Sequence, residues 1–253
     1  MYGKVKTFEI KGYNGNYSES YNDFNYLIPD TVTEIFFTDE IKPERASIID
    51  VDADGDGMVV AWTENDGTVM KVSTQIKGMK VQAPKDSGYM FYNRNNVKTI
   101  DLTNLDTVSV TSMSGLFQDC SGLTTLDLSS LDTQNVTDMS CMFYKCSGLT
   151  ALDLSSLDTQ NVTSMSGLFQ YCSSLTALDL STFDTQKVMD MDSMFYLCGN
   201  LASLTTGQNF KFVGTNYRLD GTWQNTADET FNGNSGTANF PSNIADTYTK
   251  ISD

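Results

Sequence analysis

Apolar and polar positions alternate in a short motif that recurs every 26 residues along the middle of the chain. The copies are Ile100-Asp101-Leu102, Leu126-Asp127-Leu128, Leu152-Asp153-Leu154 and Leu178-Asp179-Leu180, with Leu204-Thr205-Thr206 as a divergent fifth. Leu123 precedes the second copy and completes the spacing L-x-x-L-x-L, in which alternate side chains of a strand face inward. A fixed period of this length predicts a solenoid in which each coil adds one strand to a parallel sheet.

A second apolar pattern follows each triplet and has the period of a helix. Met139, Met142, Phe143 and Cys146 fall at i, i+3, i+4 and i+7, which is typical of the buried face of an amphipathic helix. The same stripe recurs at Met113/Leu116/Phe117/Cys120, Met165/Leu168/Phe169/Cys172 and Met191/Met194/Phe195/Cys198. The expected N-caps are Ser112, Asp138, Ser164 and Asp190, and the expected C-caps are Gly122 and Gly148. Each coil is therefore predicted to contain one helix.

Together the two patterns predict an α/β solenoid, a leucine-rich-repeat horseshoe built from 26-residue coils. Curvature is expected because strands stack about 4.8 Å apart whereas packed helices need about 8–10 Å. The predicted domains are a β-rich N-terminal cap at residues 1–88, the repeats at 89–206 and a β-rich C-terminal cap at 207–253. Terminal coils need such caps to cover an exposed core.

Charge limits the class of partner. The formal net charge is −16, with no basic stripe that could neutralise phosphates, which argues against nucleic acid and anionic membrane surfaces as targets. Asp101, Asp127, Asp153 and Asp179 occupy equivalent outward positions on successive predicted strands. We interpret this ladder as a solvated structural feature, as a ladder bridged by cations, or as a docking face for a basic partner.

A second candidate surface follows the predicted helices, where the outer positions vary between coils. Tyr144, Tyr171, Tyr196 and Leu197 place aromatic and apolar side chains toward the C-terminal coils. Aromatic residues are enriched at the centres of protein interfaces, so these positions form a candidate partner patch. Burial beneath the C-terminal cap is the alternative.

Two residue sets bear on metals. Asp50, Asp52, Asp54 and Asp56, with Gly55 and Gly57, imitate the opening of a calcium loop, but the twelfth position is not the glutamate that such loops use. A turn flanked by solvated acids is favoured over a weak calcium site. The chain has no histidine and no Cys-x-x-Cys, so we expect no zinc and no other cofactor.

The cysteines are expected to be buried, reduced thiols. Cys120, Cys146, Cys172 and Cys198 occupy one equivalent position, and helices about 8–10 Å apart would hold them beyond the roughly 7 Å limit for a disulfide. Cys141 replaces Gly115 and Gly167 and is expected to be half exposed.

The segment Leu126 to Ser140, followed by Met142-Phe143 and Cys146-Ser147-Gly148-Leu149, resembles the BspA-type leucine-rich repeat of bacterial surface proteins. That resemblance implies an extracellular or cell-surface bacterial protein that adheres to a host, and it implies no catalytic residues.

From this resemblance we expect a non-enzymatic recognition module whose partner is a protein or glycan on a host or neighbouring cell. The alternative is a structural or receptor-binding component of a phage tail, located in the virion. Residues Met1 to Val5 lack the apolar core of a signal peptide, and no apolar run is long enough for membrane insertion. The oligomeric state is left open.

Overall fold

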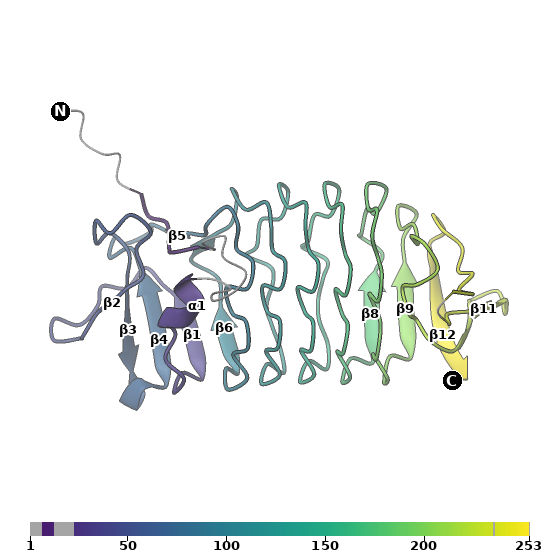
Figure 1. The fold of residues 1–253 in the computed structure, drawn as a ribbon, viewed down its shortest axis with the longest axis horizontal. Coiled ribbons are helices and arrows are strands. Elements are labelled where there is room, and N and C mark those ends of the chain that lie inside the picture. Colours follow the sequence, from purple (N-terminus) through teal and green to yellow (C-terminus); the bar gives the residue numbers. More distant parts are fainter. Residues whose placement is uncertain (1–6, 13–22, 235, 253) are drawn as a thin grey trace.

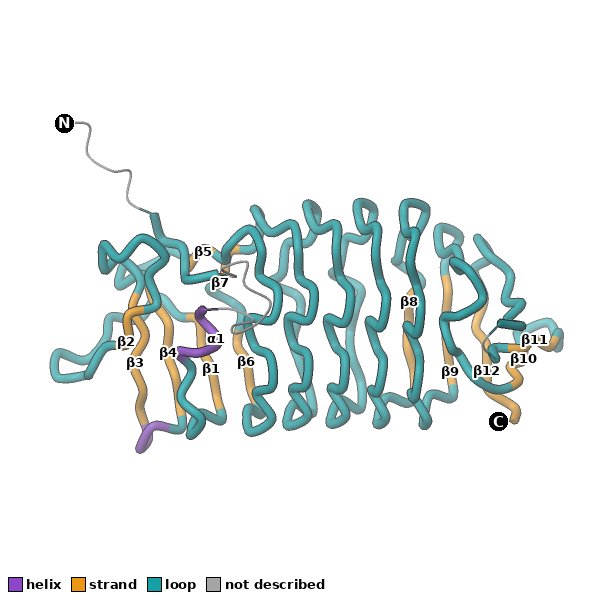
Figure 2. Tube along the Cα trace, in the orientation of Figure 1, coloured by secondary structure: helices purple, strands orange, loops and turns teal. Residues whose placement is uncertain are grey.

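The computed structural model describes residues 7–12, 23–234 and 236–252. The chain forms an elongated row of stacked units with a small sheet at each end (Figure 1). Turns and loops make up most of the row, and the strands gather toward its two ends (Figure 2). Within the described ranges, no helix has the length and apolar character needed to cross a membrane. Residues Met1 to Val5, considered above for a signal-peptide core, lie outside the described ranges.

The N-terminal sheet joins the cap to the first repeat unit, with the strand order β2-β3-β4-β1-β6. Its strands are β1 (Glu34–Phe37), β2 (Ile49–Asp50), β3 (Val60–Glu64), β4 (Val69–Ser73) and β6 (Thr99–Asp101). The short helices are α1 (Asp23–Leu27) and the 3-10 turn η1 (Asn65–Gly67), and a separate parallel pair is formed by β5 (Val81–Gln82) and β7 (Leu105–Asp106). β1 pairs in parallel with both β4 and β6, so one sheet crosses the predicted boundary between residues 88 and 89.

The C-terminal sheet covers the last repeat unit and has the order β11-β10-β12-β9-β8. Its strands are β8 (Ala177–Leu180), β9 (Ser203–Thr206), β10 (Thr222–Gln224), β11 (Thr230–Asn232) and β12 (Asp246–Ser252). β8 and β9 pair in parallel with Leu178 opposite Leu204, which preserves the sequence period. β12 runs antiparallel to β9 and thereby occupies the hydrogen-bonding edge that the next unit would have used.

The four predicted helices are wrong, because these segments are series of tight turns. In the first of them, alternate amides donate to the carbonyl three residues earlier at 2.9–3.2 Å, namely those of Leu116, Gln118, Cys120 and Leu123. The intervening amides donate to carbonyls of the next unit at 2.8–3.0 Å, namely those of Met113, Gly115, Phe117 and Asp119. An α-helix would direct its amides to carbonyls four residues earlier in the same segment. Here half of them link neighbouring units, as in a sheet.

Backbone torsions in the turn segments also exclude a helix. Cys141 and Lys145 have φ of 56° and 57°, in the left-handed region, and Gly115 and Gly167, which are equivalent to Cys141, have φ of 62°. Glycine in a helix interior costs about 1 kcal/mol relative to alanine, so these glycines were a signal against a helix. Gly122, predicted as a C-cap, has another role: a Cβ there would lie 2.3 Å from the carbonyl oxygen of Asn95 in the preceding unit.

The predicted fold class, an α/β solenoid in the form of a leucine-rich-repeat horseshoe with one helix per coil, is therefore wrong: the described strands form three small sheets, and the only helical segments among the described residues are α1 and η1. The predicted parallel strand in every coil is incomplete as well: β6, β8 and β9 form, whereas residues 125–128 and 151–154 are not paired as strands. The predicted horseshoe curvature required helices about 8–10 Å apart on one side of the stacked units. Backbone hydrogen bonds between units impose strand-like spacing, about 4.8 Å, on that side instead. The units accordingly follow one another in a nearly straight row (Figure 1).

The core of the row is a column of aromatic rings. Phe91, Phe117, Phe143, Phe169 and Phe195 contribute one ring from each successive unit. Neighbouring ring centroids are 5.5–6.1 Å apart, and neighbouring ring planes are inclined by 17° or less. All five rings are buried, so each unit covers the apolar face of the next one.

Buried threonines form a second column and link the units through hydroxyl groups. The Thr133 hydroxyl accepts a hydrogen bond from the amide of Asp158 at 2.8 Å and donates to the carbonyl of the same residue at 2.9 Å. Thr107 and Thr159 do the same for Asp132 and Asp184. This role was not predicted from the sequence, although a threonine recurs at the same point in each unit.

The repeat cysteines are free and buried, as predicted, but the helix spacing invoked to explain this is absent. Each thiol donates instead to the carbonyl of the phenylalanine 29 residues earlier. The pairs are Cys120 with Phe91, Cys146 with Phe117, Cys172 with Phe143 and Cys198 with Phe169, at 3.0–3.1 Å. Burial raises the pKa of Cys120 and Cys198 to about 12.

We expect native protein to show one slowly reacting thiol in a thiol titration near pH 8, and five after denaturation. The slow thiol is Cys141, which is half buried and whose pKa is raised by burial and by nearby Asp138 and Asp190. The thiolate is the reactive form, so a raised pKa slows the reaction. A Cys141→Ser variant serves as the control and should show no native reactivity. Rapid labelling of further thiols would contradict the packing of the column.

Candidate functional site

The acidic row consists of Asp101, Asp127, Asp153 and Asp179. Each carboxylate accepts a hydrogen bond at Oδ1 from the amide two residues later, at 2.9–3.0 Å; these amides belong to Thr103, Ser129, Ser155 and Ser181. Asp127, Asp153 and Asp179 are exposed, and Asp101 is half buried. Among the ion pairs of the described residues, none involves a member of the row. One oxygen of each carboxylate is thus fixed by the backbone, and no ion pair with another described residue neutralises the row.

Hydrogen bonds keep the centre of the row ionised. The side chain and amide of Ser129 lower the pKa of Asp127, and this effect outweighs the charge of Asp153, which acts in the opposite direction. The amide and side chain of Ser155 lower the pKa of Asp153 in the same way. The repulsion expected along a column of like charges is therefore offset by the local turn, and the surface stays negative at neutral pH.

A pocket lies where the acidic row meets the N-terminal sheet, and we call it the Phe36 pocket. It comprises two adjoining cavities, of about 280 and 400 Å³, that share Phe36, Asp101 and Thr103. Asp127 and Lys98 line the first cavity, and Glu40 and Lys71 line the second. This site was not predicted from the sequence, because its residues come from β1, β4, β6, the turn after β1 and the segment around Asp127, which meet only in the folded chain.

Tyr144, Tyr171 and Tyr196 lie together, as the sequence placed them, but they contact one another. Successive rings meet edge to face, with centroids 5.5 and 5.6 Å apart. The Lys145 ammonium lies 5.1 Å from the Tyr144 ring centroid, and the Arg218 guanidinium lies 4.2 Å from that of Tyr196. All three tyrosines are half buried, whereas the exposed fraction of Leu197 is 47%. The ring faces are thus partly used within the chain, which weakens their case as a partner patch.

The stacked units, their turn segments and the acidic row share one stretch of sequence. Residues 85–209 match the family model described as "Mycoplasma protein of unknown function, DUF285". No curated protein and no solved structure matched the chain. The resemblance to the BspA-type leucine-rich repeat is therefore wrong, because the family that matches is DUF285 and the matched segment has turns in place of the repeat's helices.

The aspartate loop lies outside the DUF285 match and brings three of its four predicted residues together. Carboxylate oxygens of Asp52, Asp54 and Asp56 lie within 4.8 Å of one another. Asp52 is buried and accepts the amide of Met58 at 2.8 Å, and Asp56 accepts the same amide at 3.0 Å. Desolvation and the neighbouring carboxyls of Asp52 and Asp54 raise the pKa of Asp56. These bonds close the turn, which favours the structural interpretation of this loop.

Asp50, the fourth residue of that loop, is separate from the cluster. Its carboxylate lies 3.4 Å from the ammonium of Lys11, which also donates to the Asp50 carbonyl at 2.7 Å. The Asp50 Oδ1 accepts the amide of Asp52 at 3.1 Å. These contacts hold the loop against the N-terminal segment.

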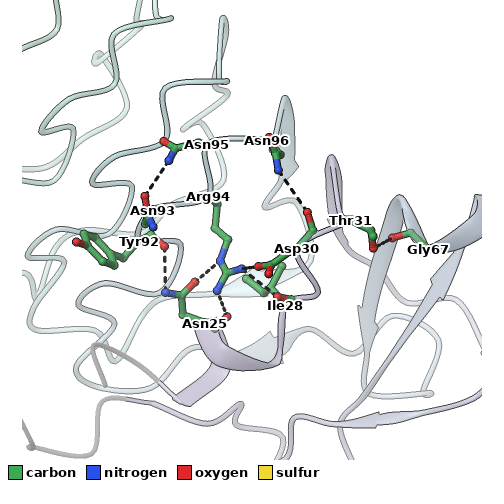
Figure 3. A network of polar contacts seen from close by, with 10 residues as sticks. All are labelled: Asn25, Ile28, Asp30, Thr31, Gly67, Tyr92, Asn93, Arg94, Asn95 and Asn96. Carbon is green, nitrogen blue, oxygen red and sulfur yellow. Dashed lines mark hydrogen bonds and ion pairs between the residues drawn. The ribbon is translucent and has the colours of Figure 1, made fainter. Parts of the chain in front are cut away.

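Arg94, inside the DUF285 match, anchors the short helix α1 to the row of units (Figure 3). Its guanidinium donates to the carbonyl and side-chain oxygens of Asn25, at 2.5 and 2.6 Å, and to the carbonyl of Ile28 at 3.0 Å. Asp30 lies 3.4 Å from the same group. Because the guanidinium already donates to oxygens of Asn25 and Ile28, in and just after α1, we assign Arg94 to fold stability rather than to ligand binding.

Proposed function

We propose that this protein is a non-enzymatic recognition module that binds a basic surface of a partner protein through the acidic row. The observation that supports this is a column of ionised carboxylates that form no ion pair with the described residues. Such a column is complementary to lysine and arginine side chains of a partner, and it would speed their encounter. The row is repeated at the spacing of the stack, so contact extends over several units.

A binding role accounts for the carboxylates better than a catalytic one. General acid–base catalysis requires titratable groups whose environments differ, so that one is protonated while another is ionised. Asp127 and Asp153 instead have equivalent partners, and their pKa values move in the same direction. We place the protein outside the cell or at its surface, where partners on a host or neighbouring cell are accessible. A role in a phage tail stays the alternative.

The test measures binding of immobilised poly-lysine to the native chain and to a double variant, Asp127→Asn with Asp153→Asn. We expect the affinity to fall steeply between low and physiological salt, and the double variant to bind about tenfold more weakly at low salt. Because the pKa values of Asp127 and Asp153 are lowered, we expect binding to persist at pH values below the range in which carboxylates usually titrate. It should be lost as the pH falls through those lowered values, because the row then becomes neutral.

The matched control is Asp132→Asn with Asp158→Asn. These residues lie in the same units and also accept the amide two residues later, at 3.1 and 3.0 Å, but they belong to the turn that carries the threonine column. The control changes the net charge equally, so it should bind nearly as well as the native chain. Equal weakening of both double variants would show that total charge, rather than the acidic row, governs binding.

A further inference from the structure

Phe36 occupies an unusual position for a large aromatic side chain. β1 alternates strictly, with Ile35 and Phe37 buried in the core and Glu34 and Phe36 on the opposite, outward face. β1 is also an interior strand of its sheet, so Phe36 has a neighbouring strand on each side. Among the ring contacts of the described residues, none involves Phe36, whereas Phe37 packs against Phe24 and Phe91. The Phe36 ring is thus partly exposed at the shared edge of the two cavities.

Strand register places groups of opposite charge on the two sides of this ring. Phe36 is opposite Lys71 on β4 and opposite Asp101 on β6. Residues directly opposite each other on parallel strands point to the same face of the sheet, and neighbouring strands lie about 4.8 Å apart. An aromatic floor is therefore flanked by a hydrogen-bond donor on one side and an acceptor on the other.

These polar groups are fixed before any ligand arrives. The Lys71 ammonium lies 2.8 Å from Glu40 and 3.2 Å from Glu64, and hydrogen bonding to Glu40 raises its pKa, so it stays charged. The Asp101 carboxylate is held by the amide of Thr103 at 2.9 Å, which leaves its second oxygen available. Preorganised groups lose little conformational entropy on binding, which favours a specific site.

The mixture of charges decides the class of ligand. A cationic ligand would meet Lys71 and Lys98, and an anionic ligand would meet Asp101, Asp127 and Glu40. A neutral polyhydroxylated ring avoids both conflicts: its hydroxyls donate to carboxylates and accept from ammonium groups, and its apolar face packs on an aromatic ring. The cavities are also near the lower end of the range of small-molecule sites, about 300–1,000 Å³.

We infer that the Phe36 pocket binds a neutral sugar ring of an oligosaccharide, a second ligand whose site overlaps the acidic row at Asp101 and Asp127 but not at Asp153 and Asp179. The Phe36 ring forms the platform for the sugar. Asp101 and Asp127 accept its hydroxyls on one side, and Lys71 donates on the other.

The experiment screens the full chain on an array of neutral, acidic and amino-containing oligosaccharides, and then titrates the best neutral binder by calorimetry. Phe36→Leu keeps an apolar side chain on β1 but removes the aromatic face, and we expect it to weaken binding about tenfold or more. Asp101→Asn should also weaken binding, because one acceptor becomes an amide. The melting temperature of each variant is also measured, and a value equal to that of the native chain shows that the fold is kept.

Asp179→Asn is the matched control, since it makes the same change in the same row but lies outside the pocket. It should leave sugar affinity unchanged, and sugar affinity should vary little with salt. By contrast, the proposed binding of poly-lysine should weaken with salt and respond to Asp179→Asn as to Asp101→Asn, so the two proposals fail separately. Absence of any neutral binder on the array, or a neutral binder unaffected by Phe36→Leu, would overturn the sugar site.

Discussion

Replacing Phe143 by alanine is expected to lower the free energy of unfolding by about 3–5 kcal/mol. Phe143 is fully buried, and its ring stacks on those of Phe117 and Phe169 at 5.8 Å on each side. The substitution opens a cavity in the middle of the aromatic column and removes two ring contacts together. Chemical denaturation followed by circular dichroism measures the loss.

Leu197→Ala is the control for this experiment. It shortens a side chain in an equivalent turn segment, but the exposed fraction of Leu197 is 47%. We expect its effect on the free energy of unfolding to stay within about 0.5 kcal/mol. If Phe143→Ala were as mild as Leu197→Ala, the aromatic column would not be what holds the units together.

Replacing Thr133 by valine is expected to lower the free energy of unfolding by at least about 2 kcal/mol, because two backbone groups lose their partner at once. The Thr133 hydroxyl serves both the amide and the carbonyl of Asp158, and the side chain is 2% exposed. Valine has a similar shape, so the change tests the hydroxyl rather than the packing. Urea denaturation with linear extrapolation gives the difference.

Thr133→Ser provides the comparison, since serine keeps the hydroxyl and loses only a methyl group. That loss should cost about 1 kcal/mol or less. The serine variant must therefore be clearly more stable than the valine variant. Equal stability of the two would mean that the hydroxyl bonds between units contribute nothing.

The apolar stripe shows why the sequence predicted burial well and secondary structure poorly. Met139, Met142, Phe143 and Cys146 are all fully buried, as the pattern indicated. A spacing of three and four residues indicates which side chains share a face, and here a series of overlapping four-residue turns buries the same positions that a helix would bury. The left-handed φ of Cys141 and Lys145 cannot be read from those residue types, because most residues in that region are glycine or asparagine.

Of the two candidate sites, one could be located from the sequence and the other could not. The acidic row could be predicted, since its members are equivalent in a repeat, and the structure places Asp127 next to Asp153. The Phe36 pocket could not, because Phe36, Lys71 and Asp101 are separated by 30 or more residues. Only the parallel pairing of β1 with β4 and β6 brings them together.

By itself, the sequence determined the 26-residue unit, the inward and outward faces of that unit and the strongly acidic surface, because period, burial and charge are properties of residue types at fixed positions. The tertiary structure alone decided where the backbone hydrogen bonds go. In the turn segments half of the amides donate to carbonyls of the next unit. Because of these bonds the segments form turns instead of helices, and the units form a straight row instead of a curved horseshoe. This pattern of hydrogen bonds depends on the free energy of all the stacked units together, which cannot be read from a local sequence pattern.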